Sequence, residues 1–207
     1  MINIRVGSLP SLKEADEILR EAEQLNPGPW VEHSLFVAQG AKLIALQCEG
    51  MDAEAAYIVG LLHDIGRRFG VTNMRHSIDG YNYLIEKGYD FVGKICLTHS
   101  HPTGNVKEAF GKWDCSNEEY EFVENFLHTA KYDDYDILIQ LCDSIALPSG
   151  FTLMEKRMID VALRHGLNDY IVPKWKATFE IKDYFESKIG KSIYDILPGV
   201  IENTFKL

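Results

Sequence analysis

Apolar residues recur at helical spacing along most of the chain. The segment LKEADEILREAEQL repeats them every three or four positions, and Ser11 with Glu14 forms a capping box ahead of it. The Pro27-Gly28-Pro29 cluster ends this first helix. The same spacing predicts helices over about 30–48, from about 52 through AEAAYIVGLLHDIG, and over 77–87 and 90–100, the last two separated by Gly88.

The helical pattern returns after one interruption. Residues 101–115, HPTGNVKEAFGKWDC, are rich in turn formers and predict a loop. Ser116 and Glu119 then form a capping box, and Asp133 or Asp134 can cap the apolar helix YDILIQLCDSIAL, which Pro148 closes. FTLMEKRMIDVALRHG and PKWKATFEIKDYFESKIG add two amphipathic helices. Because alternating strand patterns are nearly absent, we expect an all-α fold.

Composition narrows the class of protein. With 207 residues, 46% of them hydrophobic, and no repeat or linker, the chain predicts a single compact domain. The net charge of -10 opposes duplex nucleic-acid binding, although a small phosphorylated ligand needs only a few local cations. The sequence shows no signal peptide or membrane span, and its four cysteines form no C-x-x-C pair, so we expect a cytoplasmic protein with reduced thiols. The oligomeric state is not predicted.

Several histidines fall on apolar helix faces. His33 shares a face with Val37, Gly40 and Ile44, and His99 follows apolar residues at the same spacing. A lone histidine in such a place is more often a hydrogen-bonded core residue than a metal ligand, so each one alone decides little. Both side chains are nevertheless predicted to point inward.

Two further positions bring polar side chains to helix ends. His63 and Asp64 end an apolar helix, and neighbours on a helix differ by about 100° in direction, so both can reach one ion. Gly66 removes a side chain where a ligand could approach closely. His76 opens the next helix, and Gly80 one turn later would leave room for a metal centre.

Asp143 lies in the apolar sequence LIQLCDSIAL, where an ionised carboxylate is costly unless it is paired. Its partner could be an Arg or Lys from another helix, or a metal ion. The whole set contains four inward histidines and two carboxylates but no thiolate. That mixture suits iron, manganese, cobalt or nickel, with magnesium or zinc as less characteristic choices.

His33, the segment Gly60-Leu61-Leu62-His63-Asp64-Ile65-Gly66, and Asp143 stand in the order H…HD…D. In this order they resemble the HD-domain superfamily of metal-dependent phosphohydrolases, of the HDIG type, over about residues 28–150; residues 151–207 would form a C-terminal helical extension. The resemblance implies that His33, His63, Asp64 and Asp143 hold one metal. It matches His76 and His99 to the two-metal subset, in which Asp64 bridges both ions, while His101 is a competing choice for His99.

The resemblance also implies a substrate side. A basic residue after HDIG often meets substrate phosphate in this family, which points to Arg67 and Arg68, although a cationic helix end needs no such role. Lys112 and His101 in the predicted loop could also face substrate. Asp64 and Arg67 are therefore the expected catalytic residues, and a small phosphorylated molecule is the expected partner.

Three functions remain open at this point. The first is hydrolysis of a nucleotide or other small phosphate ester by a hydroxide held between two divalent metal ions. The second keeps the same ligands in a mixed-valent di-iron oxygenase that cleaves a carbon bond in a small anionic substrate. The third is a noncatalytic, metal-binding regulatory domain, although a decayed site would be expected to have lost a ligand.

Overall fold

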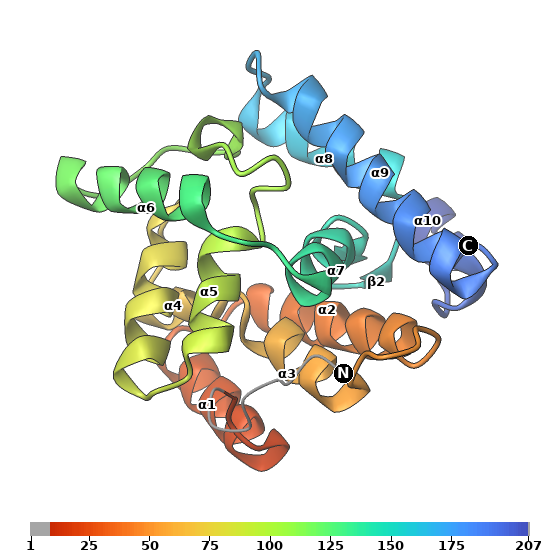
Figure 1. Cartoon of the computed structure of the whole chain (residues 1–207), viewed down its shortest axis with the longest axis horizontal. Helices are drawn as coiled ribbons and strands as arrows, with labels where there is room; N and C mark the ends of the chain where they lie inside the picture. The colour runs from red at the N-terminus through yellow and green to blue at the C-terminus, as the bar shows by residue number, and fades with distance from the viewer. Residues whose placement is uncertain (1–8, 207) are drawn as a thin grey trace.

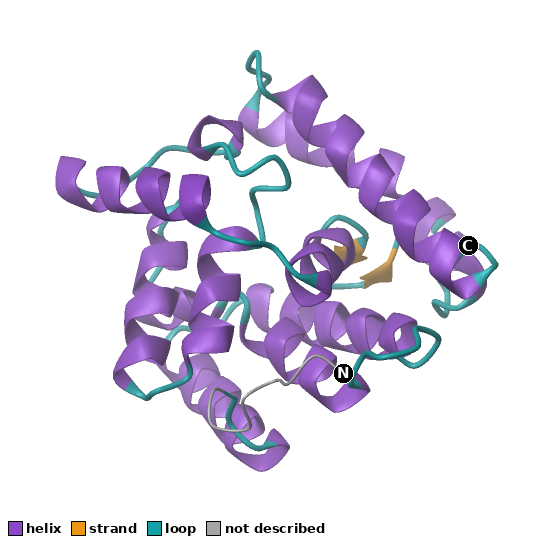
Figure 2. Cartoon of the chain, in the orientation of Figure 1, coloured by secondary structure: helices purple, strands orange, loops and turns teal. Residues whose placement is uncertain are grey.

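The computed structural model describes residues 9–206, and within them the all-α prediction is confirmed (Figures 1 and 2). The α-helices are α1 (Leu12–Leu25), α2 (Trp30–Ala45), α3 (Ala53–Leu62), α4 (Arg75–Glu86), α5 (Asp90–Thr98), α6 (Asn117–Thr129), α7 (Asp134–Asp143), α8 (Met154–His165), α9 (Ile171–Ile189) and α10 (Val200–Phe205). Short 3-10 helices are η1 (Ile65–Phe69), η2 (Val106–Glu108) and η3 (Ile193–Asp195). The strands β1 (Ala146–Leu147) and β2 (Gly150–Phe151) pair antiparallel.

The predicted helix starts are confirmed by their caps. Ser11 caps α1 and Ser116 caps α6, each in a complete capping box. Asp133, rather than Asp134, caps α7. The predicted loop over 101–115 contains only the short turn η2. Residues 1–8, which contribute to the expected absence of a signal peptide, lie outside the described part of the chain.

Two predicted helix ends are wrong. The helix expected to run through HDIG ends at Leu62, and a separate 3-10 helix begins at Ile65. The helix α7 ends at Asp143 instead of continuing to Pro148, because the chain turns there into the β1–β2 hairpin. Asp143 therefore lies at a helix terminus rather than in a helix interior. The chain after Gly190 also forms η3 and α10, which we did not predict. No helix in the described chain is sufficiently long and apolar to cross a bilayer.

One hydrophobic core joins the early and late helices. Ile44 of α2, Leu61 of α3 and Leu138 of α7 are fully buried in it, and Met154 of α8 and Phe185 of α9 belong to the same cluster. In Figure 1, α8 and α9 lie together along one side of the molecule, with α7 between them and α2. The single-domain expectation for all 207 residues stays a prediction.

Two glycines let the backbones beside the HD pair approach closely. A Cβ at Gly66 would lie 1.9 Å from the carbonyl oxygen of His76 and 2.4 Å from the Gly80 nitrogen. A Cβ at Gly80 would lie 3.1 Å from the Gly66 nitrogen and 3.0 Å from Cys96 Sγ. These glycines therefore make room for the contact between η1 and α4, not for a ligand or a metal as the sequence suggested. That contact places Asp64 beside His76.

We expect Gly66→Ala to lower the free energy of unfolding by about 3 kcal/mol or more, because the added methyl group overlaps backbone atoms that cannot move independently. Urea denaturation followed by circular dichroism measures this. Gly93→Ala is the matched control: its Cβ would lie nearest to the Ile85 side chain, at 3.2 Å, and in ordinary contact with the Tyr81 carbonyl oxygen, at 3.5 Å. Alanine also favours a helix over glycine by about 1 kcal/mol. A Gly66→Ala variant as stable as Gly93→Ala would contradict the close packing of η1 on α4.

Candidate metal centre

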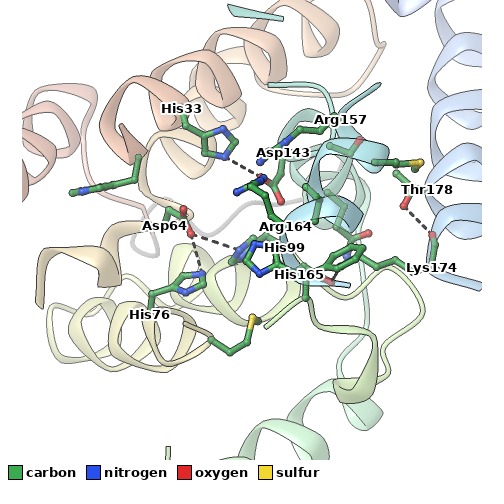
Figure 3. Close-up of a pocket in the computed structure, with 18 of the residues that line it drawn as sticks. His33, Asp64, His76, His99, Asp143, Arg157, Arg164, His165, Lys174 and Thr178 are labelled. Carbon is green, nitrogen blue, oxygen red and sulfur yellow. Dashed lines mark hydrogen bonds and ion pairs between the residues drawn. The ribbon is translucent and has the colours of Figure 1, made fainter. Parts of the chain in front are cut away.

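Two groups of potential ligands overlap at one carboxylate. His33, His63 and Asp64 form one group, and Asp64, His76 and His99 form the other; within each group the ligand atoms lie within 4.8 Å of one another. Figure 3 shows His33, His76 and His99 around Asp64, with Asp143 facing His33. The structure thus brings together all six residues proposed as metal ligands. Asp64 is the member that the two groups share.

The six residues come from five places, each at the end or on the buried face of a helix. His33 lies on α2, and the junction of α3 and η1 supplies both His63 and Asp64. His76 lies in the first turn of α4, and His99 caps the C-terminus of α5. The final residue of α7 is Asp143. Helix ends from five directions therefore converge, which explains why the residues are far apart in the sequence.

The ligand atoms of neighbouring side chains are close enough together to coordinate the same metal ion. His33 Nε2 lies 2.9 Å from Asp143 Oδ1, and Asp64 Oδ1 lies 3.1 Å from His76 Nε2 and 3.7 Å from His99 Nε2. Ligands at about 2.1 Å from an ion and at right angles to each other are about 3 Å apart. The arrangement is thus compact enough for direct coordination.

Backbone carbonyls orient three of the histidine rings. His63 Nδ1 donates to the Gly60 carbonyl at 2.7 Å, and His99 Nδ1 donates to the Cys96 carbonyl at 2.9 Å. His76 Nδ1 donates to the Asn73 carbonyl. A carbonyl oxygen can only accept, so the ring proton lies on Nδ1 and each Nε2 presents a lone pair to the interior. Such tautomer control by a second partner is typical of histidines that bind metals.

Two ligand atoms are left without hydrogen bonds. His63 Nε2 and Asp64 Oδ1 are buried and have no hydrogen-bond partner among the described residues, although each residue is at most 4% exposed. Burying a polar atom without a partner is costly, and a cation between these atoms would remove that cost. The residues present therefore fit divalent metal ions.

Burial and charge keep these groups in ligand form. Burial lowers the pKa of the His63 imidazole, and it lowers the pKa of His99 to about 3, helped by the nearby His63. Burial alone would raise the pKa of the Asp64 carboxyl, but Arg67 and His76 hold it well below its ordinary value. The pKa of Asp143 is likewise lowered against the effect of burial, chiefly by the hydrogen bond from His33. Neutral imidazoles and ionised carboxylates are the forms that bind metal.

Asp143 has no Arg or Lys in ion-pair contact within the described chain; its contact is His33. Cysteines are not part of the cluster either. Cys96 Sγ donates to the Leu62 carbonyl at 3.5 Å, and burial raises the pKa of this thiol. The donor set is therefore imidazole and carboxylate, as the sequence predicted.

Of the residues proposed to contact substrate, only Arg67 lines the adjoining cavity. Its Nε donates to Asp64 Oδ2 at 2.6 Å, and its side chain is 31% exposed. Arg68 turns away to Glu21, at 3.3 Å, with its guanidinium 4.1 Å from the centre of the Tyr83 ring. His101 is fully buried, with Nδ1 donating to the Asn105 carbonyl.

The remaining loop residue proposed to meet substrate also lies elsewhere. Lys112 is exposed, and it is not among the residues that line the cavity. His101 stacks against Trp113, with ring centres 5.9 Å apart. Of the two alternatives for this ligand position, His99 is therefore the one that lies in the cluster. For Arg68, His101 or Lys112 to contact substrate, each side chain would have to move.

The cavity has a volume of about 380 Å³ and is closed on one side by residues that sequence reasoning missed. Gln140 of α7 donates to the Thr98 carbonyl through Nε2, which leaves its buried Oε1 without a partner among the described residues. Arg157, Arg164 and His165 of α8 and Lys174 of α9 also line the cavity. The only sequence feature that points to these residues is the amphipathic pattern of α8 and α9. That pattern does not show which helix face lies against the site.

The HD-domain family model matches residues 30–147. The chain belongs to the HD-domain family. The match includes all six clustered residues and ends at β1, so α8 and α9 lie outside it. Comparison with curated proteins found no significant match, and neither did comparison with solved structures.

We expect Asp64→Ala to lose nearly all bound metal, while His76→Ala keeps part of it, because Asp64 belongs to both ligand groups and His76 to one. Elemental analysis of purified, metal-loaded variants measures the content per chain. His128→Ala, which removes an exposed histidine from α6, should keep the full content. Equal residual metal in the Asp64 and His76 variants would count against a shared carboxylate.

Proposed function

We propose that the protein is a metal-dependent phosphohydrolase that acts on a nucleotide or another small phosphate ester. The observation that carries this proposal is the position of Asp64, shared between two histidine groups at the base of a cavity that also contains Arg67. Membership of the HD-domain family supports it, because the family consists mostly of metal-dependent hydrolases.

In this proposal the cluster holds two ions, one by His33, His63, Asp64 and Asp143 and the other by Asp64, His76 and His99. Two such ions, when bound, would polarise the phosphoryl group and lower the pKa of the attacking water. Imidazole and carboxylate donors favour iron, manganese, cobalt or nickel over magnesium or zinc.

Arg67 has two tasks in this proposal. Its Nε holds Asp64 Oδ2 at 2.6 Å, which orients the shared carboxylate. The rest of its guanidinium lines the cavity, where it can donate to a phosphoryl oxygen and balance the negative charge of the transition state. Burial lowers the pKa of Arg67, but the adjacent Asp64 raises it above its ordinary value, so the positive charge is retained.

The same ligands could serve a di-iron oxygenase, and cations beside the cluster would suit any small anionic substrate. A noncatalytic regulatory domain is less well supported, because the ligand set is complete and opens into a cavity. The reaction class therefore has to be tested with and without oxygen.

We expect the metal-loaded protein to release inorganic phosphate from nucleotides or simple phosphate esters under anaerobic conditions. Arg67→Ala should lower kcat/KM by roughly 10- to 100-fold, the equivalent of losing a charged hydrogen bond worth about 1.5–3 kcal/mol. Arg20→Ala, which removes an exposed arginine from α1, is the control and should leave the rate unchanged. The phosphohydrolase proposal would be wrong if no ester is hydrolysed. The oxygenase would take its place if the protein also contains two irons per chain and consumes oxygen with an organic substrate.

A further inference from the structure

Two arginines of α8 face the cavity from the side opposite the HD motif. Arg157 and Arg164 are seven residues apart, so they lie on one face of the helix, two turns from each other. Met158 and Val161, which lie between them, line the same cavity. Figure 3 shows both arginine side chains directed toward the space next to Asp143 and His33.

Neither guanidinium has a carboxylate partner within the described chain. Arg164 Nε donates to the Asp160 carbonyl at 3.3 Å, and the Arg157 side chain makes no hydrogen bond or ion pair. By contrast, Arg67 is paired with Asp64, and Arg75 with Asp79 and Glu119. Of the three arginines that line the cavity, Arg157 and Arg164 are therefore the two that present uncompensated charge to a ligand.

The electrostatic setting makes the unpaired state of Arg157 costly. Burial lowers the pKa of the Arg157 guanidinium, nearby Asp143 raises it, and the positive charge of Arg164 lowers it again. The two guanidiniums are thus close enough to repel each other in a partly desolvated wall. An anion bound between them would remove both the repulsion and the missing hydrogen bonds.

Lys174 does not share this role. Its Nζ donates to the Ser100 carbonyl at 2.7 Å and to the Glu108 carbonyl at 3.3 Å, so it connects α9 to the loop after α5. Its hydrogen-bonding capacity is largely used within the protein, whereas that of Arg157 is free. The positive wall of the cavity therefore depends on the α8 pair.

We propose that Arg157 and Arg164 form a clamp for the dianionic phosphoryl group of a phosphate monoester, so that the protein selects monoesters over diesters. This inference rests on the proposed function. A monoester carries about two negative charges near neutral pH and three terminal oxygens, whereas a diester carries one charge and two such oxygens. Guanidinium groups match phosphate oxygens through paired N–H donors, so two unpaired guanidiniums favour the dianion.

The clamp can be tested by binding alone, without turnover. Titration calorimetry of the metal-loaded protein would use inorganic phosphate as the dianionic probe and dimethyl phosphate as the monoanionic one. Arg157→Gln and Arg164→Gln should each weaken phosphate binding at least tenfold, and dimethyl phosphate binding by less than threefold. Arg20→Gln should change neither, because its side chain is exposed on α1.

Folding and metal content are controlled separately. Arg164 is exposed, so its replacement is expected to leave the thermal midpoint and the bound metal unchanged even if Arg157→Gln proves unstable. Phosphate binding that is unaffected in the folded Arg164→Gln variant would overturn the clamp. Equal weakening for both probes would also overturn it, because the arginines would then not discriminate charge.

Failure of the clamp and failure of the proposed function give different results. Ester hydrolysis that does not depend on the α8 arginines would leave the phosphohydrolase standing and remove the clamp. Arginine-dependent phosphate binding without hydrolysis of any ester would support the clamp and overturn the phosphohydrolase.

Discussion

The structure depends on keeping one ionised carboxylate, Asp64, buried among histidines. A buried charge of this kind is stable only with cations close to it. Arg67 supplies one contact through Oδ2, while Oδ1 faces His76 and His99 without a hydrogen bond. The close packing at Gly66 allows η1 to contact α4. This contact brings Asp64 next to His76. Local packing thus produces the geometry that metal coordination would require.

The chain divides the work of the site between two regions. All six potential ligands lie in the part that matches the HD-domain family, whereas the opposite cavity wall includes α8 and α9, which lie after the match. The buried Met154 and Phe185 fix these two helices to the common core. Family membership therefore accounts for the set of potential metal ligands, and in the proposed function the late helices would determine which anion reaches them.

Much of the ligand cluster could be predicted from sequence because helical periodicity reports burial. His33 and His99 were placed inward by their apolar neighbours, and Asp143 by the cost of an unpaired charge in an apolar segment. The sequence favoured Arg67 over Arg68 as the catalytic arginine but pointed both toward substrate, whereas the path of η1 brings Arg67 to Asp64 and Arg68 to Glu21. The end of α7 at Asp143 was missed because it depends on pairing between β1 and β2.

The residues of the cavity wall could not be predicted from the sequence either, because their position also depends on tertiary contacts. Arg157 and Arg164 share a face of an amphipathic helix, but periodicity gives a face without giving its neighbour. For His101 the helical pattern itself no longer applies, because two residues after His99 the chain has left α5. The His101 ring packs against Trp113 and does not join the cluster. Tertiary contacts, not local pattern, settle both positions.

We infer that the Asp64 carboxylate is shared between two metal ions. Anomalous diffraction from crystals of the manganese-loaded protein tests it most directly. We expect two peaks about 3.5–4 Å apart, on either side of the Asp64 carboxylate, one near His33 and Asp143 and the other near His76 and His99. A single peak, with His76 and His99 turned away from it, would contradict the account.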